Sequence, residues 1–232
     1  MNRELGPTSW AAHVEVRRLL SALLCQPERD ALIQESVVPR LVSSLNELVS
    51  GNANGDAGLL RALDEEDQET LLAEYTRIFI GPNKLPAPPY ASVYREAGRQ
   101  VSGKVTEEVR RLYEEEGLAV SEGVHEPADH VALEFEFAAF LLEKAAQAWV
   151  DGSLEEAERL AAKARDFEVE HLRSWLPDLA ASIEAAAETA FYRGVAGSLV
   201  RYCNTETPTL TGQPAAATIE GTESWRSRGA TD

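Results

Sequence analysis

The chain has 232 residues, a length typical of one sizeable domain. Its 39 acidic residues outnumber its 22 basic ones, and the formal net charge is −17 at pH 7. Such a charge disfavours contact with nucleic-acid phosphates and with anionic lipid head groups, so we expect no nucleic acid among the partners and no membrane insertion.

Ala, Leu, Glu and Arg dominate between punctuating Gly and Pro residues, which predicts an all-α fold. The first predicted helix ends before Pro27, and its apolar face consists of Val16, Leu19, Leu20, Leu23 and Leu24. The second has Pro39 in its first turn and ends at residues 51–58, which we expect to be a mobile loop. The third starts with acidic residues from Asp64, where the helix dipole favours them, and runs to about Phe79.

Residues 81–94, GPNKLPAPPYASVY, contain four prolines, which fix φ and remove backbone donors. Residues 81–90 are therefore predicted to be an extended or turning loop of low entropy, with aromatic residues around it. It would serve equally as a stiff hinge between two half-bundles, at about residues 81–91, or as a rigid wall of a groove that receives a peptide. We expect a single helical domain, residues 1–203, made of two half-bundles joined by this hinge loop.

After this loop, Thr106 is predicted to cap a helix that ends at Gly117 and could be continuous with residues 92–102. A long central helix is predicted next, with Pro127 at its first position. The stripe of this helix that we expect to be buried consists of Leu133, Phe137, Phe140, Leu141 and Ala145.

Ser153 and Glu156 have the spacing of a capping box, and they predict the start of a helix that reaches Trp175. The last predicted helix spans about residues 178–203, where apolar residues recur near helical spacing. Residues 204–232 are rich in Thr, Ser, Gly, Ala and Pro and have no period, which predicts a disordered tail.

Of the four histidines, only His130 has acidic neighbours at a spacing that suggests a site. Glu126 and Asp129 precede it at the start of the central helix, and Glu134 follows one turn later on the same face. A metal site is disfavoured because no second Glu-x-x-His element completes a set of ligands. Capping of the helix by these acids, with His130 bonded to one of them, is the simpler interpretation.

Motifs that would indicate catalysis are absent from the sequence. No G-x-S-x-G context surrounds a serine, and residues 51–58 lack the Lys and Ser/Thr of a phosphate-binding loop, so we expect neither an enzyme nor a bound cofactor. Cys25 and Cys203 belong to no C-x-x-C pair and are expected to be free thiols. The first residues lack the apolar core of a signal peptide, and no 18-residue apolar run occurs, so we expect a cytoplasmic protein.

Three blocks of the sequence resemble a known family. GPNKLPAPPYASVY follows EYTRIF, and EPADHVALEFEFAAFLLEKA and HLRSWLPDLAASIEAAAETAFYRGVAGSL come later in the chain. Together they resemble the TorD/DmsD/NarJ family of redox-enzyme maturation chaperones, over roughly residues 10–203.

The resemblance implies an all-helical cytoplasmic chaperone that binds the twin-arginine signal peptide of a molybdenum-containing oxidoreductase subunit. Such a chaperone holds the apoprotein until its cofactor is inserted, and so assists its assembly and export. Carried over position by position, the peptide-binding region of the family falls on Tyr75, Phe79, Leu85, Pro86, Pro89 and Tyr90, with Glu126, Asp129 and His130 across a groove.

A twin-arginine peptide has a basic region followed by an apolar stretch, so its receptor needs acidic groups beside an apolar groove. Our hypothesis is that Glu126 and Asp129 contact the arginines and that His130 orients these carboxylates. The Pro-rich loop and the aromatic residues beside it accept the apolar segment. The residues by themselves leave open a metal-dependent enzyme on a helical bundle, a scaffold that binds no leader peptide, and either a monomer or a dimer.

Overall fold

The computed structural model describes residues 7–49, 56–81, 85–98, 100–121 and 123–208, and within these ranges it has helices and no strands, which confirms the all-α fold class. The predicted tail lies outside the described residues from position 209 onward. The elements are α1 (Pro7–Leu23), α2 (Arg29–Gln34), α3 (Val37–Leu48), α4 (Asp56–Glu65), α5 (Gln68–Tyr75), the π-helix η1 (Thr76–Ile80), α6 (Ala91–Arg95), α7 (Lys104–Glu115), α8 (Val131–Val150), α9 (Leu154–Phe167), the π-helix η2 (Glu168–Leu172), α10 (Leu176–Ala186) and α11 (Ala190–Cys203).

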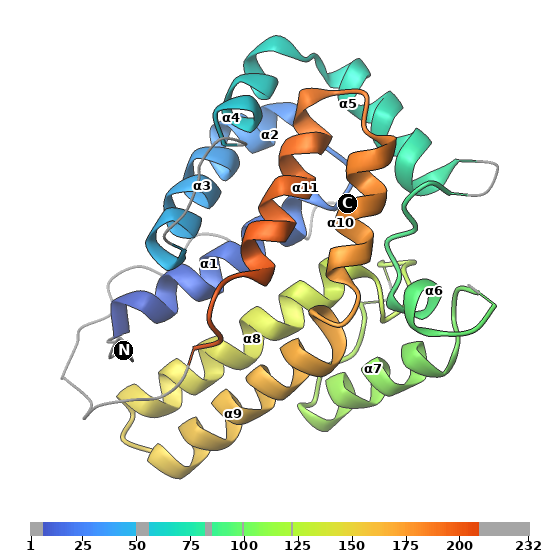
Figure 1. Cartoon of the computed structure of the whole chain (residues 1–232). Coiled ribbons are helices and arrows are strands. Elements are labelled where there is room, and N and C mark those ends of the chain that lie inside the picture. Colours follow the sequence, from blue (N-terminus) through green and yellow to red (C-terminus); the bar gives the residue numbers. More distant parts are fainter. Residues whose placement is uncertain (1–6, 50–55, 82–84, 99, 122, 209–232) are drawn as a thin grey trace.

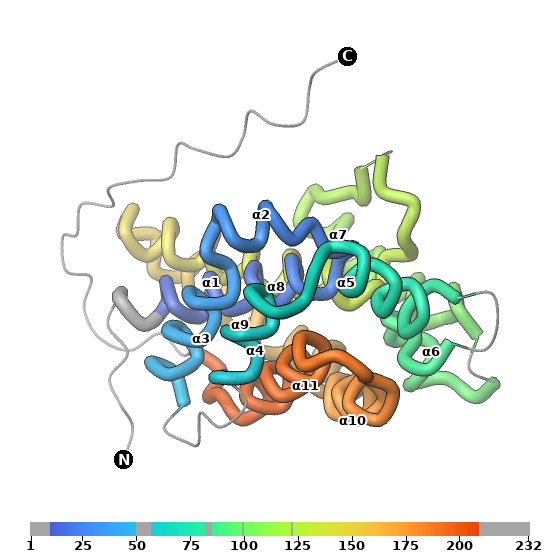
Figure 2. The backbone as a smooth tube through the Cα atoms, turned by 90° about the horizontal axis from the view of Figure 1, so that it is seen from above, coloured from blue at the N-terminus to red at the C-terminus, as the bar shows by residue number. Residues whose placement is uncertain are grey.

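Helix α8 is the central element, because it contacts both α1 and α9 along its length (Figure 1). Of its predicted inner stripe, Phe137, Leu141 and Ala145 are buried, whereas Leu133 and Phe140 are only partly covered. Helices α10 and α11 form an antiparallel pair, and α11 also packs on α4. Figure 2 shows this pair lying together along one edge of the molecule.

We name residues 81–90 the proline-rich connector; its residues 82–84 lie outside the described part of the chain. The connector leads from η1 to α6 (Figure 1). Elements from the two sides of the connector pack directly on one another, α1 on α8 and α4 on α11, and they share one apolar core. The two half-bundles joined by a hinge therefore stay a prediction.

The helix predicted from Asp64 to Phe79 is divided, and this prediction was wrong at its start. Helix α4 already begins at Asp56, inside the segment predicted to be a loop, and residues 51–55 of that segment lie outside the described chain. The division has a local cause, because the Asp67 carboxylate accepts a hydrogen bond from the Thr70 N–H at 2.8 Å and so caps a new helix, α5. The acidic run thus ends one helix and begins the next.

Two predictions about α7 were also wrong. Thr106 does not cap the helix, which begins after Gly103, and the Glu96 carboxylate accepts from the Val105 N–H at 2.7 Å. Helix α7 is not continuous with α6, since the segment between them turns through positive φ angles at Gly98 and Ser102. The described residues 92–98 are therefore the end of a short helix followed by a turn.

The helix predicted to reach Trp175 is interrupted. Ser153 precedes α9 as expected, but its side chain makes no capping hydrogen bond and Glu156 instead pairs with Arg159 at 2.8 Å. The regular α-helix ends at Phe167, where the wider turn of η2 begins. Trp175 lies just before α10 rather than at the end of α9.

The last predicted helix is split into α10 and α11 by acidic side chains from far earlier in the chain. The Glu74 carboxylate accepts from the backbone N–H groups of Glu188, at 2.5 Å, and Thr189, at 2.9 Å. Glu66 accepts from the Ala190 N–H at 2.7 Å. These carboxylates satisfy donors at the start of α11 that a continuous helix would have bonded internally, so the chain turns here.

A buried polar network joins α1 to the end of α11. Arg17 donates to the Glu168 carboxylate of η2, and both side chains are almost completely buried. Glu168 also accepts from the Tyr202 hydroxyl at 2.9 Å and from Arg173 at 3.3 Å. Arg173 in turn donates to the carbonyl oxygen of Thr205 at 2.7 Å. Since a buried carboxylate is costly without partners, this network requires that α1, η2 and α11 be in place together.

Replacement of Gly194 by alanine tests the contact between α11 and α4. A Cβ at Gly194 would lie 2.5 Å from Leu59 Cβ, so Gly194→Ala should lower the free energy of unfolding by about 1–3 kcal/mol in urea denaturation followed by circular dichroism. The matched control is Gly197→Ala on the same helix, where a Cβ meets nothing within 4 Å. It should leave stability unchanged or raise it by up to about 1 kcal/mol. Equal stability of the two variants would contradict this packing.

The buried His13 predicts a pH dependence of stability. Burial, followed by the charges of Arg17 and Arg173, lowers the pKa of His13 to about 3. In the unfolded chain this imidazole takes up its proton near its ordinary pKa of about 6.5, so the free energy of unfolding falls as the pH drops through the window between these values. Between about pH 7 and pH 5 we expect His13 to account for a loss of about 2 kcal/mol, which His13→Gln removes. Parallel stability curves for the two proteins would rule this out.

Candidate functional site

The proline-rich connector is joined to the start of α8 by an isolated antiparallel bridge between Tyr90 and His130. The Ala91 N–H donates to the Asp129 carbonyl at 3.0 Å, and the Val131 N–H donates to the Pro89 carbonyl at 2.9 Å. Prolines cannot donate, so the connector contributes the Pro89 carbonyl to this contact, and the N–H on this side comes from Ala91, the first residue after the connector. The two segments that carry the proline and EPADH motifs therefore lie side by side.

Asp129 is the best-satisfied side chain at this junction. It is completely buried, and one carboxylate oxygen accepts from the Ser92 N–H at 2.8 Å while the other accepts from the Thr106 hydroxyl at 2.8 Å. Tyr113 of α7 donates to the carbonyl of the preceding residue, Ala128, at 2.9 Å. These bonds fix α6 and α7 against the segment that leads into α8, and they leave the Asp129 carboxylate no exposed edge.

His130, and not Pro127 as predicted, marks the beginning of α8. Its Nδ1 accepts from the Ala132 N–H at 3.2 Å and caps the helix, which begins at Val131. Burial lowers the pKa of His130, which favours the neutral imidazole that this acceptor role requires. The ring also meets the Tyr90 ring edge to face, with centroids 5.4 Å apart. Capping is thus performed by His130 itself rather than by the acids around it.

The exposed part of the junction is a tyrosine and a carboxylate. The Tyr90 hydroxyl donates to Glu126 Oε2 at 2.8 Å, and Glu126 is exposed to solvent whereas Tyr90 is partly so. Partial burial and this bond raise the pKa of Tyr90. The pKa of Tyr75 rises to about 12, mainly because the ring is buried and secondly because of the negative charges of Cys25 and Glu126. Tyr75, Tyr90 and Glu126 thus belong to one neighbourhood, and Cys25, after the end of α1, lies beside it.

The structure divides the nine predicted site residues into two groups. Buried are Tyr75, Phe79, Pro89, Asp129 and His130. Open to solvent, wholly or in part, are Leu85, Pro86, Tyr90 and Glu126. The rings of Tyr75 and Phe79 contact each other at 5.2 Å, and Phe79 also contacts Tyr192 of α11 at 5.7 Å. These aromatic residues form an underlying layer and do not themselves provide an accessible surface.

Sequence reasoning missed Ser92, Thr106 and Tyr113 as residues of the junction. Thr106 was assigned to the cap of its own helix, and Asp129 follows it by 23 positions, with no periodic signal of their contact. Nothing in the local pattern distinguishes Tyr113 from any other aromatic residue on an apolar face. Only the folded chain reveals these partners.

The residue pair His130 and Glu134 does not form a metal site. The Glu134 carboxylate is completely buried and accepts from the Trp175 indole N–H at 3.2 Å, and burial raises its pKa well above the ordinary value. Within the described ranges there is no group of three or more His, Cys, Asp or Glu side chains placed to hold a metal ion. Among the helices that the structure describes, none combines the length and apolarity that crossing a bilayer demands.

Comparisons with known proteins identify similar chains. A family model described as nitrate reductase delta subunit matches residues 46–181. Chaperone protein TorD of Vibrio parahaemolyticus is 30% identical over 200 residues, which cover 86% of this chain and 83% of that protein. Chaperone protein TorD of Photobacterium profundum is 31% identical over 149 residues, 64% of this chain and 68% of the relative.

A likeness in structure agrees with these matches in sequence. A protein of Archaeoglobus fulgidus, described as a redox enzyme maturation protein, has a crystal structure that matches with a TM-score of 0.53. The match covers 82% of this chain and 92% of the other, at 23% identity. At that identity the likeness establishes a shared helical fold.

Removal of the Asp129 carboxylate tests its part in holding the junction. Asp129→Ala leaves the Ser92 N–H and the Thr106 hydroxyl without an acceptor, so the free energy of unfolding should fall by about 2–4 kcal/mol in urea denaturation. Thr106→Val removes one of the two bonds and should cost about 1 kcal/mol. Glu126→Ala, a change at an exposed carboxylate of the same segment, should cost less than about 0.5 kcal/mol. An effect of Asp129→Ala no larger than that of Glu126→Ala would contradict the structural role.

Proposed function

This chain belongs to the nitrate reductase delta subunit family of redox-enzyme maturation chaperones, and from that premise we propose that it binds the twin-arginine signal peptide of a molybdenum-containing oxidoreductase subunit. In this proposal it holds the apoprotein of the catalytic subunit in the cytoplasm and assists cofactor insertion, assembly and export. The relatives that match most of the chain are named chaperones, so the protein is a chaperone and not an enzyme.

The observation that carries the proposal is the backbone bridge between Tyr90 and His130. It brings the connector and the EPADH segment into contact, although Glu126 follows its partner Tyr90 by 36 positions. A rigid connector needs little ordering when a peptide binds, because its prolines have already lost most of their backbone freedom. This supports a preformed peptide surface at the junction.

Glu126 is the residue that we propose for contact with the arginines. It is exposed, and Tyr90 occupies only one of its two carboxylate oxygens among the described contacts. A guanidinium can therefore approach the other oxygen or displace the tyrosine hydroxyl and bind both. The net charge of −17 attracts a basic segment over a longer range.

Asp129 and His130 have a different part in the proposal from the one expected. Both Asp129 oxygens are occupied within the fold, and His130 caps α8, so neither side chain is free to meet an arginine. We assign them as positioning residues. They hold the backbone bridge, and through it they place Tyr90 beside Glu126.

For the apolar part of the leader, the accessible residues are Leu85, Pro86 and Tyr90. Tyr75 and Phe79 are buried. Ile78, which lies between them in the chain, accepts a hydrogen bond from the Ala87 N–H at 3.3 Å, so this segment supports the connector from beneath. The peptide would thus lie on the connector rather than enter the aromatic layer. Burial of its apolar side chains there supplies a favourable term of about 25 cal/mol per Å².

Isothermal titration calorimetry with the cognate leader peptide tests the proposal. The wild-type protein should bind, and Glu126→Gln should weaken binding about tenfold, because a charge-assisted hydrogen bond to arginine is lost. Glu155→Gln is the charge-matched control. It removes an exposed carboxylate from α9, which contributes no residue to the junction, and should leave the affinity unchanged.

A scaffold that binds no leader would give no heat with the wild-type protein, which would refute the proposed function. Equal weakening by Glu126→Gln and Glu155→Gln would show that net charge, and not the junction, attracts the peptide.

A further inference from the structure

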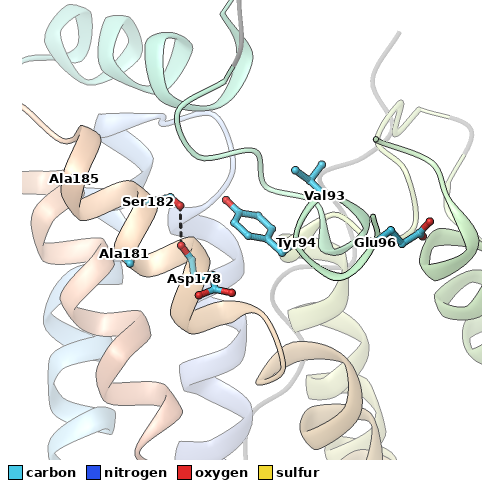
Figure 3. Close-up of a pocket in the computed structure, with 7 residues that line it drawn as sticks. All are labelled: Val93, Tyr94, Glu96, Asp178, Ala181, Ser182 and Ala185. Atoms are coloured by element: carbon cyan, nitrogen blue, oxygen red, sulfur yellow. Dashed lines mark hydrogen bonds between the residues drawn. The ribbon is translucent and has the colours of Figure 1, made fainter. Parts of the chain in front are cut away.

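A hollow lies between α6 and α10, and neither Tyr90 nor Glu126 lines it. It has a volume of about 460 Å³ and is open to solvent, and Figure 3 shows the residues that line it. We name it the α6/α10 groove; its lining consists of Val93, Tyr94, Glu96, Asp178, Ala181, Ser182 and Ala185. This volume lies within the range of about 300–1,000 Å³ found for sites that enclose small ligands or side chains.

One carboxylate of the groove is available. Asp178 is exposed in the first turn of α10, and no cation or hydrogen-bond donor of the described chain contacts its carboxylate. The Ser182 hydroxyl donates to the Asp178 carbonyl at 2.7 Å, so it leaves the side chain of Asp178 free. Glu96, the other acid, accepts from the Val105 N–H through Oε1 and is only partly exposed. Among the described residues, Asp178 is therefore the carboxylate of the groove whose two oxygens both lack a partner.

The aromatic wall of the groove is held in a fixed orientation. Tyr94 stacks on Trp175, with ring centroids 5.3 Å apart and planes 28° apart. Trp175 is fully buried, and its indole N–H donates to Glu134. Figure 3 shows the Tyr94 ring extending from α6 toward Ser182 and Asp178. A rigid aromatic ring beside a free carboxylate suits a planar cation better than a spherical one.

We propose that the α6/α10 groove binds the guanidinium of one of the two leader arginines, an inference that rests on the proposed function. Arginine can stack on Tyr94 while its fork meets the Asp178 carboxylate, and lysine can do only the latter. The small side chains of Ala181 and Ala185 leave room for the aliphatic stem.

The two arginines would have separate acceptors. Tyr90 contacts Glu126, whereas Tyr94, four residues later, extends toward α10. Adjacent side chains of an extended peptide point in opposite directions. A leader that crosses the start of α6 in an extended form therefore presents one arginine to Glu126 and its neighbour to Asp178.

Calorimetry with four synthetic leader peptides tests this assignment: Arg-Arg, Arg-Lys, Lys-Arg and Lys-Lys at the twin positions. Asp178→Asn should weaken the Arg-Arg peptide about fivefold, as expected for a partly exposed pair. It should weaken equally the single-lysine peptide that keeps its arginine in the groove, and weaken less the peptide whose lysine lies there, because lysine pairs with Asp178 without the fork and the stacking. Glu126→Gln should show the reverse pattern. Ala185→Leu, at an exposed helical position, should fill the groove and reproduce the effect of Asp178→Asn.

Glu184→Gln is the matched control, because it removes an exposed carboxylate from the same helix outside the groove. It should leave all affinities unchanged, and circular dichroism should show that each variant is folded. The methyl resonances of Ala181 and Ala185 should shift on addition of the Arg-Arg peptide.

The outcomes separate the two proposals. Absence of binding by the wild-type protein would refute the proposed function and this inference with it. Binding that Glu126→Gln weakens, but that Asp178→Asn and Ala185→Leu leave unchanged, would refute the groove alone. Equal losses for all four peptides on Asp178→Asn would show a general charge effect and would also refute it.

Discussion

The carboxylate of Asp129 lies where the start of α6, the first turn of α7 and the approach to α8 meet, and it takes one hydrogen bond from each of the first two. A buried carboxylate is costly unless its oxygens have donors, so these three segments can vary little in their relative positions. The bridge between Tyr90 and His130 depends on this arrangement, and so does the placement of Tyr90 beside Glu126. The accessible surface of the junction is therefore set by a residue that no partner can touch.

Features that depend on neighbouring residues could be predicted from the sequence. The apolar spacing in α1 and the inner stripe of α8 gave helices in the right places, because a helix repeats its buried face every three to four residues. The resemblance of the connector and the EPADH segment to one family placed both in a single region, and the backbone bridge joins them. Proline chemistry alone had left hinge and groove wall equally favoured.

Features that depend on distant residues could not be predicted in this way. Glu74 divides α10 from α11 by accepting from N–H groups that follow it by more than a hundred positions, and no periodicity near residue 187 signals this break. The solvent exposure of a side chain could not be predicted either. The residue type of Asp129 suggested a contact with arginine, whereas its complete burial excludes one. Residue type indicates what chemistry a side chain can perform, and only packing decides whether a ligand can reach it.

The Arg17–Glu168 pair joins residues 151 positions apart, and Glu168 shares its charge with Arg173, which holds the backbone at Thr205. During synthesis, Arg17 leaves the ribosome long before any of these partners exists. The first helix therefore cannot complete its polar contacts until the end of α11 has been translated, and the core closes after most of the chain is free. A chain with this topology therefore completes the polar part of its core only when synthesis has passed α11.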